Sequence, residues 1–278
     1  MKQKIALLVI DPQNDFVDKH PQNPDFHPAL AVPGASDDLI RLSAFLGRVG
    51  DSISTVMVSL DSHQPIDIAH PSGWVDKNGV EVGAFTPISA DACEKGEFRW
   101  NKAPRYAIEY TRALENNGEF QHFIWPPHCL IGTPGLNVYP VFMDALQVWS
   151  KATGQAINFV AKGSSIYVEH FGIFAAQIPH QVGGATDPAT TLNMPAINTL
   201  ASHDIVYLAG EARSHCVATS LKQLLDNAPQ LASKLVILTD CTSNVAGLPA
   251  DFYTEVEKIY DRAKSMGVQF MTSDQVQF

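Results

Sequence analysis

The sequence predicts an α/β protein with a three-layer α/β/α architecture around a doubly wound, mostly parallel sheet. Short continuous apolar runs, typical of strands buried on both faces, alternate with longer segments of helical periodicity. Such alternation implies right-handed crossovers, which make the strands parallel. Polar residues recur directly after the strands, where open parallel sheets bind their ligands. The expected strands are residues 5–10, 54–60, 156–161, 205–209, 235–239 and 268–271.

Length and composition favour one large globular domain spanning residues 1–278, since 45% of the residues are hydrophobic. The net charge of −10 argues against nucleic acid and against an anionic membrane surface as partners. Four cysteines without a C-x-x-C pair favour a reduced protein. The first apolar run is too short for a signal peptide or a membrane span, so we expect a cytoplasmic location.

The first strand, 5–10, ends directly in Asp11, which places a carboxylate at its carboxyl end. Ser36 has the character of an N-cap for the helix that follows. The buried face of that helix is expected at Leu39, Ile40, Leu42, Phe45, Leu46 and Val49. The second strand, 54–60, is followed at once by Asp61 and His63.

Residues 72–124 interrupt this alternation of strands and helices. Glycine, proline and charged residues dominate the segment, and only 107–117 has a helical pattern. We therefore expect a lid-like insertion over one end of the sheet, without a core of its own.

The alternation then resumes. An amphipathic helix over 138–153 precedes strand 156–161, which ends in Lys162. A helix near 195–201 leads to strand 205–209, and a polar stretch after Gly210 leads to Cys216 and a further helix. Strand 235–239, a charged helix over 251–266 and strand 268–271 complete the predicted fold.

Cys216 is the candidate nucleophile. Unpaired N–H groups and the positive end of a helix dipole favour a thiolate at a helix start, and a thiolate attacks carbonyl carbon. Asp11 would accept the thiol proton if burial raises its pKa, and Lys162 would supply a fixed positive charge. The alternatives are that Cys216 is a small buried apolar residue and that Asp11 and Lys162 form a structural ion pair.

A second set of residues suits one divalent metal ion. Asp61 and His63 form a D-x-H pair on the same side of an extended segment, and His128, preceded by two prolines, is the best third ligand. His70 is a possible fourth ligand or a hydrogen-bond partner of a metal-bound water. Zinc is favoured, and iron(II) or manganese(II) remain open. The alternative is a group of exposed loop histidines.

At this point the chain resembles the isochorismatase-like cysteine hydrolases, in their nicotinamidase/pyrazinamidase branch. The family motif D-x-Q-N-D-F matches residues 11–16, and its D-x-H motif matches 61–63. The motif W-P-x-H-C-x-x-G-T-x-G matches 125–135, and a lysine–glycine pair falls at 162–163. The nucleophile motif G-x-A-x-x-x-C-V-x-x-T/S matches 210–220. The motifs span most of the chain in the family's order.

The resemblance implies a metal-dependent amidase that converts nicotinamide, or a close heteroaromatic amide such as pyrazinamide, to the acid and ammonia through a thioester. It implies a role in NAD salvage, a small-molecule amide as partner and a homo-oligomer. It implies a cis peptide before Ala212. Asp11, Lys162 and Cys216 would be the catalytic residues, and the N–H groups of Ala212 and Cys216 would form the oxyanion hole. Phe16 and Trp125 would hold the substrate ring, and Asp61, His63 and His128 would bind the metal ion.

Three departures from the family pattern leave the substrate open. Ser214 stands where the family has an aspartate, the segment 167–174 differs, and the insertion is long. Arg213 would meet an acidic substrate or lie in solvent. The rival hypotheses are an amidase for ureido or carbamoyl compounds, whose relatives generally lack the metal ligands, and a non-catalytic binding subunit. Isochorismate cleavage is the weakest reading, because that chemistry needs no cysteine.

Overall fold

The computed structural model describes residues 3–182 and 185–277. A six-stranded sheet forms its centre, in the order β12-β11-β10-β1-β2-β7, and each neighbouring pair is parallel. The strands are β1 (Ile5–Ile10), β2 (Ile53–Asp61), β7 (Ile157–Lys162), β10 (Ile205–Gly210), β11 (Leu235–Leu238) and β12 (Gln269–Met271). The predicted strands and their parallel arrangement are therefore confirmed.

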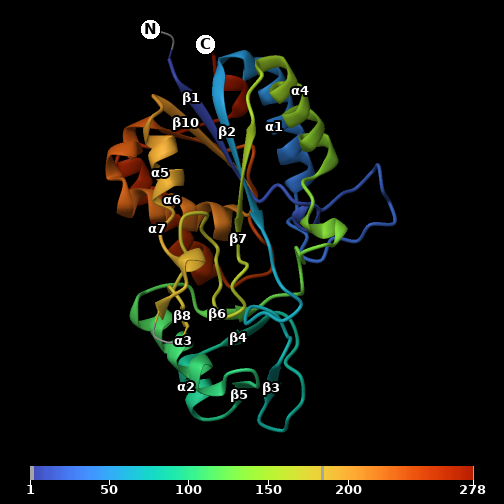
Figure 1. The fold of residues 1–278 in the computed structure, drawn as a ribbon, viewed down its shortest axis with the longest axis vertical. Coiled ribbons are helices and arrows are strands. Elements are labelled where there is room, and N and C mark those ends of the chain that lie inside the picture. The colour runs from blue at the N-terminus through green and yellow to red at the C-terminus, as the bar shows by residue number, and fades with distance from the viewer. Residues whose placement is uncertain (1–2, 183–184, 278) are drawn as a thin grey trace.

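Helices cover both faces of the sheet (Figure 1). On one face lie α1 (Ala35–Val49) and α4 (Pro140–Thr153), and on the other α5 (Met194–Ala201), α6 (Ala218–Asn227) and α7 (Ala250–Ser265). The chain runs outward from β1 to β2 and β7, and then returns to build β10, β11 and β12 on the other side of β1. This reversal confirms the doubly wound, three-layer prediction and places the switch point between β1 and β10.

The two strands at the switch point approach each other closely. All six residues of β1 are buried, as expected for the centre of a sheet covered on both faces. Gly210 ends β10 with a positive φ of 111°, and a Cβ atom there would collide with the backbone of Ile10. Glycine is therefore required where the chain turns toward Cys216.

The segment 72–124 forms most of a second lobe beyond the carboxyl ends of the strands (Figure 1). It contains β3 (Trp74–Asp76), β4 (Thr86–Ile88), α2 (Ala90–Glu94), β5 (Phe98–Trp100), α3 (Pro104–Asn116) and β6 (His122–Ile124). A separate buried cluster forms around Trp74, Trp100 and Tyr110. The expectation that this segment has no core of its own is wrong, because aromatic residues spread along the segment gather into this cluster. The single-domain organisation stays a prediction.

Two details of the first helix differ from the sequence prediction. Gly34, and not Ser36, is the N-cap of α1, because the Asp18 carboxylate accepts hydrogen bonds from the N–H groups of Gly34 (3.1 Å) and Ser36 (3.0 Å). A side chain from the preceding loop thus replaces the local cap. Ile40 is 47% exposed and does not belong to the buried face.

The remaining short strands, β8 (Gln181–Val182) and β9 (Ala185–Thr186), pair with each other. Within the described ranges, every helix is too short or too polar to cross a lipid bilayer.

Candidate active site

Four strands deliver polar side chains to one place at the carboxyl edge of the sheet. Asp11 follows β1, Asp61 ends β2 and Lys162 ends β7. Cys216 lies in a single π-helical turn, Arg213–Val217, between β10 and α6. Asp11, Asp61, Lys162 and Cys216 are all buried. The structure therefore brings together the residues that the sequence placed at separate strand ends.

Lys162 lies at the centre of this group. Its Nζ is 2.9 Å from Asp11 Oδ2, 3.0 Å from Asp61 Oδ1 and 3.7 Å from Cys216 Sγ. It also donates to the His170 carbonyl at 3.0 Å. Burial alone would lower the pKa of Lys162, but Asp11 and Asp61 hold that pKa well above its usual value. The lysine is therefore a permanent positive charge between two carboxylates.

Asp11 is a carboxylate with a raised pKa. Burial is the largest cause of the rise and Asp61 adds to it, whereas Lys162 and the Ser59 hydroxyl oppose it. The Ser59 hydroxyl donates to Asp11 Oδ1 at 2.6 Å, and Ser59 Oγ accepts the Asp11 N–H at 3.0 Å. A buried carboxylate with a raised pKa is a suitable proton acceptor for a neighbouring thiol.

The Cys216 thiol differs from the sequence expectation. Burial raises its pKa well above the usual value, and Asp11 and Asp61 add to the rise, so that Lys162 only partly offsets them. The prediction of a lowered pKa is wrong, because the partial charge of a helix start is weaker than complete desolvation beside two carboxylates. Cys216 is therefore a thiol at rest and needs a base before it can attack.

The chain between β10 and Cys216 has the predicted backbone feature. The peptide bond between Glu211 and Ala212 is cis. Ala212 and Cys216 both line a pocket at the carboxyl edge of the sheet. Arg213 turns away from this pocket and pairs with Glu257, with Nη2 and Oε2 3.0 Å apart. The Arg213 guanidinium is therefore paired with Glu257 and does not line the pocket.

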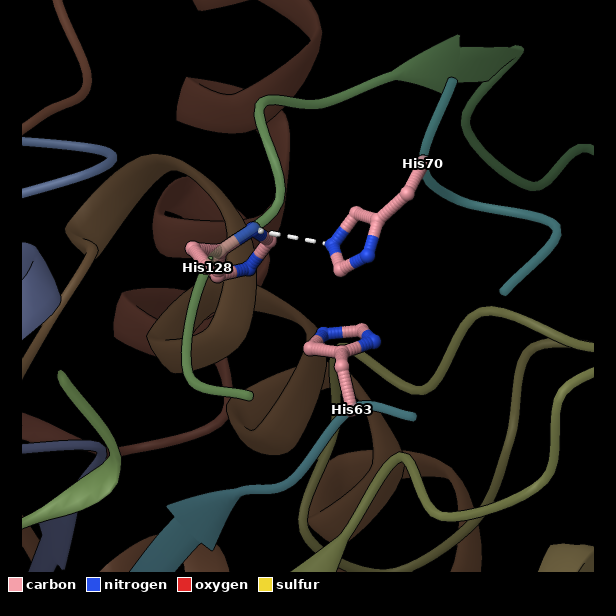
Figure 2. A group of neighbouring side chains, drawn as sticks. All are labelled: His63, His70 and His128. Carbon is pink, nitrogen blue, oxygen red and sulfur yellow. Dashed lines mark hydrogen bonds between the residues drawn. The ribbon is translucent and has the colours of Figure 1, made fainter. Parts of the chain in front are cut away.

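The four predicted metal ligands lie together beside the lysine. Asp61 Oδ2 is 3.1 Å from His63 Nε2 and 3.4 Å from His128 Nε2. His70 Nε2 is 3.2 Å from His128 Nδ1. The rings of His63 and His70, from the loop between β2 and β3, face that of His128, from the loop after β6 (Figure 2). One nitrogen of each histidine lies within 4.8 Å of the others. All four residues are buried.

The donor set fits a divalent cation. Asp67 Oδ2 accepts a hydrogen bond from His63 Nδ1 at 2.8 Å. Carboxylates commonly bind one ring nitrogen of a metal-bound histidine in this way, which leaves the other nitrogen, here Nε2, for the metal. Burial, His63 and His128 lower the pKa of His70 to about 2, so its ring is neutral, and His70 Nδ1 is buried without a hydrogen-bond partner. Burial would lower the pKa of His63, but Asp61 and Asp67 hold that pKa well above its usual value, so a metal ion would replace a proton on this ring. Imidazole nitrogens beside one carboxylate are typical ligands of zinc or iron(II).

Phe16 and Trp125, the predicted ring-binding residues, both line the pocket above Cys216. The pocket volume is about 20 Å³, room for about one water molecule. Trp125 also forms a wall with Phe171 and His215: the Trp125 and His215 rings are perpendicular with centroids 5.1 Å apart, and those of Phe171 and His215 are 5.4 Å apart. These three residues are called the aromatic wall below. An aromatic ring is larger than this volume, so some of the residues that line the pocket must move to admit one.

Sequence reasoning missed several residues that support the site. Gln13 holds Asp61 through two hydrogen bonds, Nε2 to the Asp61 carbonyl (2.8 Å) and the Asp61 N–H to Oε1 (2.7 Å). Ser59 and Asp67 act on Asp11 and His63 as described, and Glu169 lines the pocket with a pKa raised by burial. Gln13 stands in the first motif, and Asp67 follows His63 by four residues, so both had a visible signal. Glu169 had none.

Comparison with solved structures identifies the fold. A nicotinamidase/pyrazinamidase from Acinetobacter baumanii aligns over 99% of both chains with a TM-score of 0.63 and 18% identity. Yeast nicotinamidase aligns over 96% of this chain and 99% of its own, with a TM-score of 0.59 and 21% identity. A Pyrococcus horikoshii pyrazinamidase, solved in complex with zinc, aligns over 97% and 99%, with a TM-score of 0.51 and 15% identity.

These likenesses extend over nearly the whole chain and confirm the fold that the sequence motifs implied. No family model matches the chain, and no curated protein matches it in sequence. At these identities the shared property is the fold, and the argument for an activity comes from the site.

Proposed function

We propose that the protein is a metal-dependent cysteine amidohydrolase that converts nicotinamide, or a close heteroaromatic amide such as pyrazinamide, to the carboxylic acid and ammonia. The observation that carries the proposal is the position of Lys162. Its Nζ contacts Asp11 and Asp61 and lies 3.7 Å from Cys216 Sγ. A buried lysine between a base and a nucleophile is more than a structural ion pair requires, and three of the solved neighbours with this fold are named as amidases of this class.

Each of these residues has a role in one step of acyl transfer. Asp11 accepts the Cys216 thiol proton, and the thiolate attacks the amide carbon. The backbone N–H groups of Ala212 and Cys216 would hold the oxyanion, and Asp11 returns the proton to the leaving ammonia. Water, deprotonated by Asp11, then cleaves the thioester and restores the thiol. Lys162 keeps the Asp11 carboxylate in place and offsets the negative charge that forms on sulfur.

Asp61, His63 and His128 would hold the metal ion, with His70 as a further ligand or as the partner of a bound water. The ion supplies a Lewis-acid position that a pyridine-type nitrogen can occupy. The nucleophile already comes from Cys216, so the residues around the ion serve binding and orientation. Phe16 and Trp125 would hold the ring between them, with the carboxamide above Cys216.

Ammonia release from nicotinamide and benzamide tests the proposal. The two amides have the same shape, but benzamide lacks the ring nitrogen. A site built for a polar contact rejects analogues that lack it by up to ~10⁴, so we expect kcat/KM for nicotinamide to exceed that for benzamide by at least about 10². Equal values would contradict the proposal, and a preference for open-chain ureido compounds would favour the rival amidase hypothesis.

The cytoplasmic location, the homo-oligomer and the role in NAD salvage stay predictions. A non-catalytic binding subunit is disfavoured, because a chain without catalysis has no need to keep a buried lysine, two carboxylates and a thiol in contact.

A further inference from the structure

A second, larger pocket lies on the outer side of the aromatic wall. Its volume is about 390 Å³, against about 20 Å³ for the pocket above Cys216. It lies between the second lobe, which supplies Phe120 and Phe123, and the start of α7, which supplies Phe252. This cavity is called the outer pocket. It is large enough for an aromatic ring without rearrangement.

The outer pocket adjoins the candidate active site. Trp125, Phe171 and His215, the three residues of the aromatic wall, line both pockets. On its outer side the wall contacts a further ring: the His215 and Phe252 rings are stacked with centroids 4.8 Å apart. Because the wall residues separate the two pockets, movement of these side chains would join them.

The lining of the outer pocket selects a particular chemistry. Phe120, Phe123 and Phe252 provide aromatic walls, and burial lowers the pKa of His215 to about 3, so that ring is neutral. Asp251 and Glu255 also line the pocket, and the Glu255 carboxylate is paired with Lys258 at 2.6 Å. With three phenylalanines and a neutral imidazole, such a lining favours a neutral aromatic group.

We propose that the outer pocket is a second substrate subsite, which binds an aromatic group attached to the amide that Cys216 hydrolyses. This inference rests on the proposed amidohydrolase function and narrows its substrate class to heteroaromatic amides with an aromatic extension. The extension belongs either to the ring or to the amide nitrogen. In the first case it stays with the acyl group, and in the second it leaves with the amine.

Steady-state kinetics with substituted amides tests the subsite in the metal-loaded full chain. The probes are nicotinamide, 5-phenylnicotinamide for the ring-attached group, and N-benzylnicotinamide for the nitrogen-attached group. We expect at least one phenyl-bearing probe to exceed nicotinamide in kcat/KM by about 10-fold, the gain expected from burying an additional ring. Whichever probe gains identifies the side that carries the extension.

Variants locate that gain in the outer pocket. Phe252→Ala and, independently, Phe120→Ala should lower the ratio of kcat/KM for the phenyl-bearing probe to kcat/KM for nicotinamide by about 10-fold. Each variant removes a ring that the extension would contact. Phe159→Ala removes another partly exposed phenylalanine, 44% exposed on the edge strand β7, and should leave the ratio unchanged. Phe252→Leu keeps an apolar side chain at the position and should retain part of the gain.

The outcomes separate the subsite from the proposed function. Hydrolysis of nicotinamide with no gain from any phenyl group, or a gain that survives both alanine variants, overturns the subsite and leaves the function standing. Hydrolysis of a phenyl-bearing amide but not of nicotinamide supports the subsite and overturns nicotinamide as the substrate. Hydrolysis of none of the probes overturns both.

Discussion

The two sides of the pocket above Cys216 are held by different forces. On one side, Asp11, Asp61 and Lys162 form a buried group, called the charged floor, in which each charge has a partner within 3.0 Å. On the other side, the aromatic wall is held by ring packing at centroid distances of 5 to 6.5 Å. The floor rests on strand ends of the sheet, whereas the wall comes from the segments that follow β6, β7 and β10.

This difference separates the residues that carry out the reaction from the residues that select the substrate. Buried, mutually paired charges tolerate little displacement, because each unpaired charge costs several kcal/mol. Ring packing is less restrictive, because aromatic pairs are stable in both stacked and edge-to-face arrangements. The floor therefore specifies the chemistry, and the wall is free to specify which amide reaches it. The predictions below run from the floor toward its surroundings, in order of expected effect.

Loss of the nucleophile should remove activity from every amide alike. We expect Cys216→Ala to lower kcat by at least about 10⁴, as removal of a covalent nucleophile does, with nicotinamide and with phenyl-bearing amides equally. Cys93→Ala is the matched control, since Cys93 is also buried but lies in the second lobe. If Cys93→Ala lost activity to the same degree while still folded, Cys216 would not be the nucleophile.

Removal of the central lysine should affect stability as well as activity. Lys162→Met leaves Asp11 and Asp61 buried without their cation, and we expect the free energy of unfolding in urea to fall by about 3–5 kcal/mol. The double variant Asp11→Asn/Lys162→Met removes one of the two stranded carboxylates. It should regain part of the stability but none of the activity. A double variant as unstable as Lys162→Met alone would show that the floor is not held by charge pairing.

The metal ligands should affect binding of the substrate at least as much as turnover. We expect His63→Ala and His128→Ala to lose bound metal, measured by elemental analysis, and chelation to raise KM at least as much as it lowers kcat, by roughly 10–10². His203→Ala is the control, because His203 is also buried but bonds Thr55 Oγ1 at 2.9 Å and Thr199 O at 2.8 Å. Full occupancy in either test variant would remove that histidine from the ligand set.

The smallest predicted effect is a change in pH dependence. The Ser59 hydroxyl donates to the charged form of Asp11 and lowers its pKa, so Ser59→Ala should raise that pKa further. Since Asp11 must be deprotonated to accept the thiol proton, the acid limb of kcat/KM should move to higher pH. Ser54→Ala removes another β2 hydroxyl, one that donates to the Ile5 carbonyl, and should leave the limb in place. A shift to lower pH would contradict the role of Asp11 as base.

Much of the floor could be predicted from the sequence, because strand order and polar residues at strand ends are local signals. Asp11, Asp61, Lys162 and Cys216 each follow an apolar run, and parallel strands bring their ends together without further information. The pKa of Cys216 could not be predicted, because it depends on burial and on the positions of Asp11 and Asp61 relative to the sulfur.

The surroundings of the charged floor were harder to predict from the sequence. The second lobe packs around Trp74, Trp100 and Tyr110. Tyr110 lies in the one stretch with a helical pattern, but Trp74 and Trp100 lie outside it, so local periodicity did not predict this core. Phe171 and Phe252 reach the wall and the outer pocket from segments distant in sequence. Contacts of this kind follow from tertiary packing, which local sequence patterns do not encode.

The central claim is that Cys216 carries the acyl group during turnover. Mass spectrometry of the acid-quenched enzyme, taken during steady-state hydrolysis of nicotinamide and followed by proteolysis, measures this directly. The account predicts a nicotinoyl thioester on the peptide that contains Cys216, and its absence from the Asp11→Asn variant, in which the thiol has no base. An acyl group on another residue, or continued ammonia release by Cys216→Ala, would contradict the account.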